Sequence, residues 1–262
     1  MVRPRTSSPI RARSGPRTIS PADTADHGTN VVSDHTVKAF DEDIGELRGL
    51  IAQMGGLAEQ AIGAAIDALQ RHDLAAAAKV VAGDKQIDAI EMQVEQLAVR
   101  IIALRAPMAD DLREVVAALK IASVVERIGD YAKNIAKRVP EIDAHSEIEP
   151  LSILPAMANL AKAMVHDVLD AFAARDAQAA VEVCERDRAV DDFYNSLFRV
   201  FVTHMMENPK TIGQVAQLLF IAKNLERVGD HATNVAEMVY YAATGEHMAE
   251  RDRSSLITNE EV

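Results

Sequence analysis

The feature that most constrains this chain is that its second half repeats its first. Residues 126–136 read ERIGDYAKNIA, and residues 226–236 read ERVGDHATNVA, at an offset of 100 residues. Upstream, three aspartates recur at an offset of 103, so that Asp73, Asp84 and Asp88 correspond to Asp176, Asp187 and Asp191. A repeat of this length predicts two copies of one supersecondary unit.

Each copy carries the apolar spacing of amphipathic helices. In the opening segment of the first copy, apolar residues recur every three or four positions from Phe40 through Ile51 to Ala65, as expected for one helix face. The chain is rich in Ala, Leu, Glu and Arg and has no Trp, a composition that favours helices over sheets. Prolines and turn residues divide the pattern into predicted helices at 36–71, 73–106, 110–139, 151–174, 176–207 and 210–243. The predicted fold is all-α, with two tandem, similar three-helix bundles at 36–140 and 151–244.

The two ends of the chain do not follow this pattern. Residues 1–33 contain four prolines, and residues 1–20 contain five arginines and no acid. Such a composition cannot bury a core, so we predict a disordered basic extension. A wrongly assigned start codon and a lipid-touching arm are the alternatives. Residues 245–262 are predicted to form a C-terminal tail.

Charge and cysteine content limit the classes of partner. The formal net charge is −12, which argues against nucleic acid as a partner because phosphate backbones attract Lys and Arg. Cys184 is the single cysteine, so an internal disulfide is excluded and a reducing cytoplasm is favoured. No apolar run reaches the roughly 18 residues that span a bilayer. We therefore expect a cytoplasmic protein that meets the inner membrane only through partners.

Acidic residues four positions apart form one step on each of two helices in both copies. Spacing by four places such residues on one helix face, one turn apart. An antiparallel hairpin brings together residues that are equidistant from its turn. Asp84 with Asp130, and Asp88 with Glu126, both centre on Pro107. The corresponding pairs in the second copy centre between residues 208 and 209. The sequence therefore predicts one acidic cluster in each copy. The first consists of Asp84, Asp88, Glu126, Asp130 and Asn134, and the second of Asp187, Asp191, Glu226, Asp230 and Asn234.

Two interpretations of these clusters remain open at this point. Massed carboxylates can share a cation, and an all-oxygen set favours hard ions such as magnesium, manganese, calcium or iron, with zinc less suited. The alternative is a solvated, salt-bridged helix face, because Arg127, Arg227, Lys133 and Lys223 lie nearby in sequence. Gly129 recurs as Gly229 inside these helices at a cost of about 1 kcal/mol relative to Ala, which close helix approach would explain.

At these residues the sequence resembles the PhoU family. The resemblance rests on VERIGD at 125–130, LERVGD at 225–230, and ADDLR at 109–113 followed by LKIA at 119–122. It implies a fold of two similar three-helix bundles, and metal clusters bound through the motif acids. It also implies a homodimeric negative regulator of the phosphate-starvation response. The implied partners are the ATPase of the phosphate ABC transporter, PstB, and the sensor histidine kinase PhoR.

Three functions are compatible with the residues of this chain. The first is a non-catalytic adaptor that relays the state of the transporter to the kinase. The chain has no P-loop and no Gly-x-Ser-x-Gly elbow, which agrees with a protein that is not an enzyme. A carboxylate-bridged metalloenzyme would use Glu-x-x-His pairs, and the sequence contains none. The third is a metal-free helical scaffold.

Overall fold

The computed structural model describes residues 29–143 and 152–248, and in these ranges it is helical throughout apart from turns. The first half consists of α1, Thr29–Arg71, α2, Leu74–Arg105, and α3, Asp110–Ala136, followed by the short 3-10 helix η1, Val139–Glu141. The second half consists of α4, Leu154–Ala174, α5, Ala177–Glu207, and α6, Ile212–Thr244, with the 3-10 helix η3, Pro209–Thr211, before α6. The predicted all-α fold of two three-helix bundles is confirmed.

The repeat extends to the way the helices begin. Asp73 caps α2, its carboxylate accepting from the Ala76 N–H at 2.9 Å. Asp176 caps α5 in the same way, accepting from the Gln178 and Ala179 N–H groups. The residues before these caps, His72 and Arg175, both adopt left-handed backbone conformations, with φ of 50° and 56°. The same turn therefore separates the first and second helices of both halves.

The main difference from the sequence prediction lies at the start of α1. The helix begins at Thr29 rather than Thr36, so residues 29–33 of the predicted extension are helical. The last helix-breaking residue before it is Gly28, and adding residues to an existing helix costs little compared with starting one. Residues 1–28 of the predicted extension, most of the 140–150 loop and residues 249–262 of the predicted tail lie outside the described residues.

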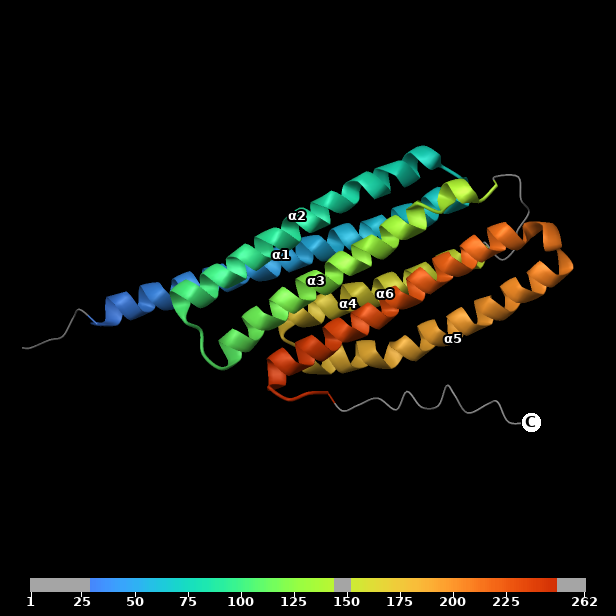
Figure 1. Ribbon diagram of the computed structural model, residues 1–262. Coiled ribbons are helices and arrows are strands. Elements are labelled where there is room, and N and C mark those ends of the chain that lie inside the picture. Colours follow the sequence, from blue (N-terminus) through green and yellow to red (C-terminus); the bar gives the residue numbers. More distant parts are fainter. Residues whose placement is uncertain (1–28, 144–151, 249–262) are drawn as a thin grey trace, which may run out of the picture.

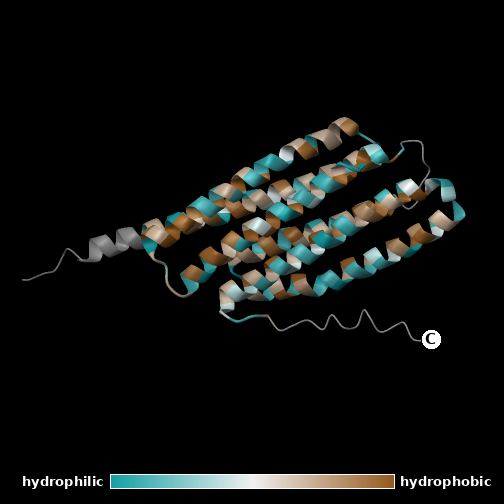
Figure 2. Cartoon of the chain, in the orientation of Figure 1, coloured by the Kyte–Doolittle hydropathy of each residue, from teal (hydrophilic) through white to brown (hydrophobic). Residues whose placement is uncertain are grey.

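Helices α1, α3, α4 and α6 form a central layer, and α2 and α5 flank it on either side. α2 packs on α1 and α3, and α5 packs on α4 and α6, while α1 contacts α4 and α3 contacts α6 between the halves. Figure 1 shows α2 and α5 along opposite edges, and the α2–α3 and α5–α6 turns at opposite ends of the molecule. Each helix carries both hydrophilic and hydrophobic residues along its length (Figure 2).

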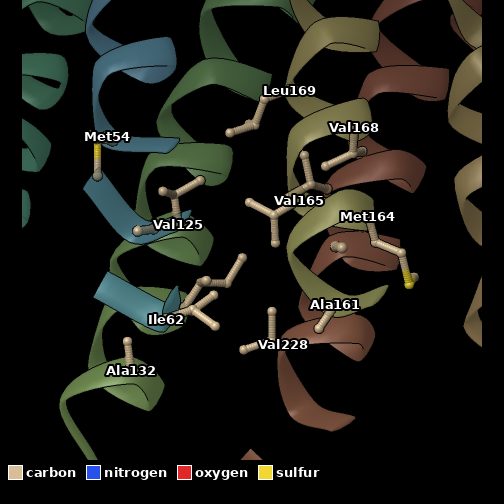
Figure 3. Close-up of a cluster of buried hydrophobic side chains, with 14 of the residues drawn as sticks. Met54, Ile62, Val125, Ala132, Ala161, Met164, Val165, Val168, Leu169 and Val228 are labelled. Carbon is tan, nitrogen blue, oxygen red and sulfur yellow. The ribbon is translucent and has the colours of Figure 1, made fainter. Parts of the chain in front are cut away.

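The two bundles share one hydrophobic core rather than standing as separate domains. Met54 and Ile62 of α1, Val125 of α3, Val165 of α4 and Val228 of α6 meet in it (Figure 3), and each exposes 0% of its surface. α1 lies close to α4 at Gly55, where an added Cβ would overlap the end of Leu169.

A buried ionic group also joins the halves. Glu114 of α3 exposes 3% of its surface. Arg48 of α1 donates to its Oε1 at 2.6 Å, and Arg175, after α4, pairs with its Oε2. The corresponding position in the second half holds Gln214, whose Oε1 accepts from the Asp143 N–H at 3.3 Å.

Candidate metal centres

Glycine sets how closely the acid-bearing helices approach. A Cβ added to Gly129 would lie 2.7 Å from Ile87 Cδ1 and 3.7 Å from Asp84 Oδ1. In the second half, a Cβ added to Gly229 would lie 3.4 Å from Asp187 Oδ1. The backbone of one helix thus passes directly beside a buried aspartate of the other in both halves. This register agrees with the one predicted from the positions of the turns.

A lysine joins two acids of the first cluster. Lys133 Nζ donates to Asp84 Oδ2 at 2.5 Å and to Asp130 Oδ1 at 2.9 Å. These two bonds raise the pKa of Lys133, so it is a cation at neutral pH. Asp84 is buried, with 6% of its surface exposed, and its charge is balanced by this ammonium group. The first pair of the predicted cluster therefore meets around a lysine of the chain itself.

The other acids of the first cluster repel one another. Burial raises the pKa of Glu126, and the nearby charges of Asp130, Glu91, Asp88 and Asp84 raise it further. Like charges that lie close together raise one another's pKa values in this way.

Glu91 belongs to this group of acids, although the sequence prediction missed it. Burial raises the pKa of Glu91, the charges of Asp88 and Glu95 raise it further, and a hydrogen bond with Ser123 opposes the shift. Glu91 lies three residues after Asp88 rather than four, and its counterpart in the second half is Tyr194. The sequence held one signal that could have found it, because a residue three positions away also lies on the same helix face.

The second cluster has a lysine at a different place. Lys223 Nζ donates to Glu226 Oε1 at 2.5 Å and lies 5.1 Å from the centre of the Tyr194 ring. Burial raises the pKa of Glu226, Lys223 lowers it, and the charges of Asp230 and Asp191 raise it again. The other oxygen, Glu226 Oε2, is buried and has no hydrogen-bond partner within residues 29–143 and 152–248. Asp187 is buried here as Asp84 is in the first half.

The two asparagines of the predicted clusters lie on the same helices as the acids that precede them, on α3 and α6. Asn134 and Asn234 are half-buried, one turn beyond Asp130 and Asp230. His231 follows Asp230, but its ring packs edge-on against Tyr131 at 5.2 Å and its Nδ1 donates to the Arg227 carbonyl. His231 thus belongs to the contact between α3 and α6 rather than to the acidic cluster.

The chemistry of these residues fits a hard cation, although the side chains are not in ligand positions. Within residues 29–143 and 152–248, no three His, Cys, Asp or Glu side chains are arranged to hold one ion. The donors are carboxylates, which hard ions prefer, and no described residue donates a hydrogen bond to the buried Glu226 Oε2. Glu91 and Glu126 are both half-buried.

Comparisons with known proteins agree with the repeat and the fold. The PhoU domain matches twice, over residues 51–139 and 154–239. The chain is 56% identical to the phosphate-specific transport system accessory protein PhoU homolog of Zymomonas mobilis, covering 84% of this chain and 92% of that protein. It is 45% identical to the homolog of Caulobacter vibrioides, covering 83% of this chain and 95% of that protein.

Two crystal structures have the same architecture. PhoU from Pseudomonas aeruginosa superposes with a TM-score of 0.75 at 35% identity, covering 79% of this chain and all of that one. The phosphate transport system regulatory protein PhoU from Streptococcus pneumoniae superposes with a TM-score of 0.75 at 29% identity, covering 80% of this chain and all of that one. In the part of the chain that the structure describes, no helix is apolar over a length that would cross a bilayer. With both halves matched and close relatives covered almost end to end, this chain belongs to the PhoU family.

Proposed function

We propose that this chain is a non-catalytic regulator of phosphate uptake and of the phosphate-starvation response. The observation that carries the proposal is the match of both halves to the PhoU domain. Relatives that share this organisation are named accessory or regulatory proteins of phosphate transport. Because the chain spans nearly the whole length of these relatives, the likeness concerns the complete proteins.

We infer that the protein acts in the cytoplasm as an adaptor. The partners implied by the family resemblance are the transporter ATPase PstB and the sensor kinase PhoR, with a second copy of this chain forming a homodimer. Contact with the membrane would then be indirect. Apolar side chains at both hairpin turns support association with other proteins: Leu104, Met108 and Met206 expose 71%, 80% and 78% of their surfaces.

Deletion in the native host tests the regulatory role. Without a negative regulator, alkaline phosphatase should be produced even in high phosphate, and expression of the full-length chain should restore repression. Phosphatase output that stays low in the deletion strain would reject the regulatory role. Co-purification of the tagged chain with PstB and PhoR, compared with an untagged strain, tests the two partners separately.

We also propose that the two acidic clusters bind hard cations, with iron, manganese and magnesium suited best and zinc less well. The residues that would hold them are the carboxylates of each cluster, assisted by the amides of Asn134 and Asn234. The mutual repulsion around Glu126 and the buried Glu226 Oε2 support this. Lys133, which already neutralises Asp84 and Asp130, instead favours a metal-free scaffold.

Elemental analysis and thermal shift decide between these alternatives. A cation that binds only the folded state adds about 2.7 kcal/mol of stability at 100 times its dissociation constant. Purified protein without metal, and without a gain in melting temperature on adding Mn²⁺, Mg²⁺, Fe³⁺ or Zn²⁺, would support the scaffold.

A further inference from the structure

Helices α3 and α6 meet along a seam whose outer side remains exposed. The two helices contact each other and lie side by side in Figure 1. Tyr131 of α3 packs against His231 of α6, and Arg138 Nη1, just after α3, donates to Gln217 Oε1 of α6. These contacts recur along the seam, so the side chains beside it form one continuous surface.

This surface carries positive charge and no negative charge. Residues at three- and four-residue spacing from Lys120 to Arg138, and from Gln217 to Met238, share one side of each helix. No Asp or Glu occupies any of these positions, although the formal net charge of the chain is −12. We name this surface the basic face and define it by six residues: Lys120, Arg127, Tyr131, Arg138, Phe220 and Arg227.

The charges of the basic face are not neutralised by carboxylates of the chain. Lys120, Arg127 and Arg227 are exposed, and within residues 29–143 and 152–248 none of them has an ion-pair partner. Arg138 donates to the neutral amide of Gln217, and its Cζ lies 4.4 Å from the centre of the Phe220 ring. The face is therefore open to groups of opposite charge.

Arg127 and Arg227 stand at equivalent positions of the repeat and reach the same part of the seam. Burial lowers the pKa of His231, the Arg227 carbonyl and Asp230 oppose this shift, and the charges of both arginines lower the pKa further. Two guanidinium groups from different halves thus lie close to one imidazole ring at the middle of the face.

The composition of the basic face is typical of a protein interface. Arg, Tyr and Phe are enriched at the centres of such interfaces, whereas Asp and Glu are depleted. Guanidinium groups also match carboxylates with two parallel hydrogen bonds. The acids Asp130 and Asp230 border the face towards α2 and α5, so they repel carboxylates placed to either side. An acidic segment about as wide as one helix, roughly 10–12 Å, fits between them.

We propose that the basic face binds an acidic amphipathic helix of a partner protein, with its carboxylates at Arg127 and Arg227 and its apolar side chains at Tyr131 and Phe220. This inference rests on the proposed adaptor role and adds to it a surface and the chemistry of the partner. An anionic membrane fits less well, because the net charge of −12 opposes approach to such a surface.

Fluorescence anisotropy of the full-length protein with model peptides tests the inference. The distance along α3 from Lys120 to Arg138 is about 27 Å, the length of a helix of about 18 residues. The probe is therefore a labelled amphipathic helix of that length made of Glu, Leu and Ala, and the reference peptide has Gln for Glu. The acidic peptide should bind about tenfold more tightly than the reference, and added salt should remove most of this difference.

Charge reversal on the face provides the residue-level test. Arg127→Glu with Arg227→Glu should weaken binding of the acidic peptide by about tenfold or more, because like charges would then face each other. Lys85→Glu with Arg188→Glu is the matched control, since these exposed residues also occupy equivalent positions of the repeat, on α2 and α5. The control changes the net charge equally and should leave the affinity within about twofold. If circular dichroism shows that charge reversal disturbs the fold, Arg127→Gln with Arg227→Gln replaces it.

The results that would overturn the inference are distinct. An acidic peptide that binds no more tightly than the reference, or that both variant pairs weaken equally, would reject the basic face as its site. Binding to phosphatidylglycerol vesicles without binding to the peptide would assign the face to a membrane. Self-association of the wild type that the arginine variants abolish, again without peptide binding, would assign it to a second copy of the chain. The regulatory role is tested separately, because only the deletion strain can reject it.

Discussion

Replacing Glu114 by Gln should lower the free energy of unfolding, because Glu114 connects helices of the two bundles. The carboxylate is 3% exposed and accepts from Arg48 and Arg175, whose side chains are 30% and 44% exposed. A glutamine keeps the size of the side chain, but its NH₂ group must face one of the two guanidinium groups, donor against donor. Gln214 at the corresponding position shows that the amide itself is compatible with the start of such a helix.

The magnitude follows from the exposure of the two arginines. Breaking a fully buried ion pair costs about 3–5 kcal/mol. Because both arginines keep contact with water, we expect a smaller loss of about 2–3 kcal/mol. For a chain of this size, each kcal/mol shifts the melting temperature by about 2–4 °C, so the expected fall is about 4–12 °C.

Urea denaturation followed by circular dichroism measures this loss directly, with differential scanning calorimetry giving the melting temperature. The control is Glu141→Gln, which removes an exposed carboxylate near the opposite end of α3 and should change stability by no more than about 0.5 kcal/mol. If Glu114→Gln lowers the free energy of unfolding no more than this control does, the ion pairs of Glu114 contribute as little as exposed ones, and the predicted role of Glu114 in connecting the bundles is wrong.

Three further predictions test the packing, the pH dependence and the acidic clusters. Gly55→Ala should be less stable than its neighbour variant Gly56→Ala by about 1–3 kcal/mol. The reason is that a Cβ at Gly55 overlaps Leu169, whereas one at Gly56 meets nothing within 4 Å. Equal unfolding midpoints of the two variants would contradict the close contact between α1 and α4. The charge of Glu59 is the main cause that raises the pKa of His166, so the stability that His166 contributes is complete below its usual pKa and is lost as the pH rises through its raised pKa. His166→Gln should thus differ most from the wild type at acidic pH, and a difference that grows with pH in denaturation curves would refute this sign. Asp130→Ala combined with Asp230→Ala should lower the metal content measured by elemental analysis while preserving the helical circular dichroism signal, and an unchanged metal stoichiometry would remove both residues from the site.

The parts of the fold that sequence could predict are those fixed by local periodicity and by the repeat. The helix boundaries near Asp73, Pro107 and Pro209 follow from capping and from proline geometry, and they differ from the structure by only a few residues. The register of α2 against α3 followed from the turn at Pro107, because the distance from a turn fixes which residues of an antiparallel pair lie opposite each other. Gly129 beside Asp84 agrees with that arithmetic.

The contacts that sequence could not predict depend on long side chains and on distant segments. Lys133 reaches Asp84 across 49 residues of sequence, and nothing in the local pattern distinguishes it from lysines that stay in solvent. The contact of Arg175 with Glu114 requires the packing of one bundle on the other, which no helical period encodes. The earlier start of α1 at Thr29 shows that composition alone predicts poorly the residue at which a helix begins.

The contact between Tyr131 and His231 has a consequence for how the two halves came to differ. These residues occupy equivalent positions of the repeat, and they touch each other across α3 and α6. In a pair of identical subunits related by a two-fold axis, a position on that axis must meet its own copy. The single chain therefore has the layout of a symmetric dimer of three-helix units whose two partners are covalently connected. Connection lifts the requirement for identical residues, so a tyrosine can face a histidine, and each half can acquire substitutions that a symmetric dimer would be forced to make twice.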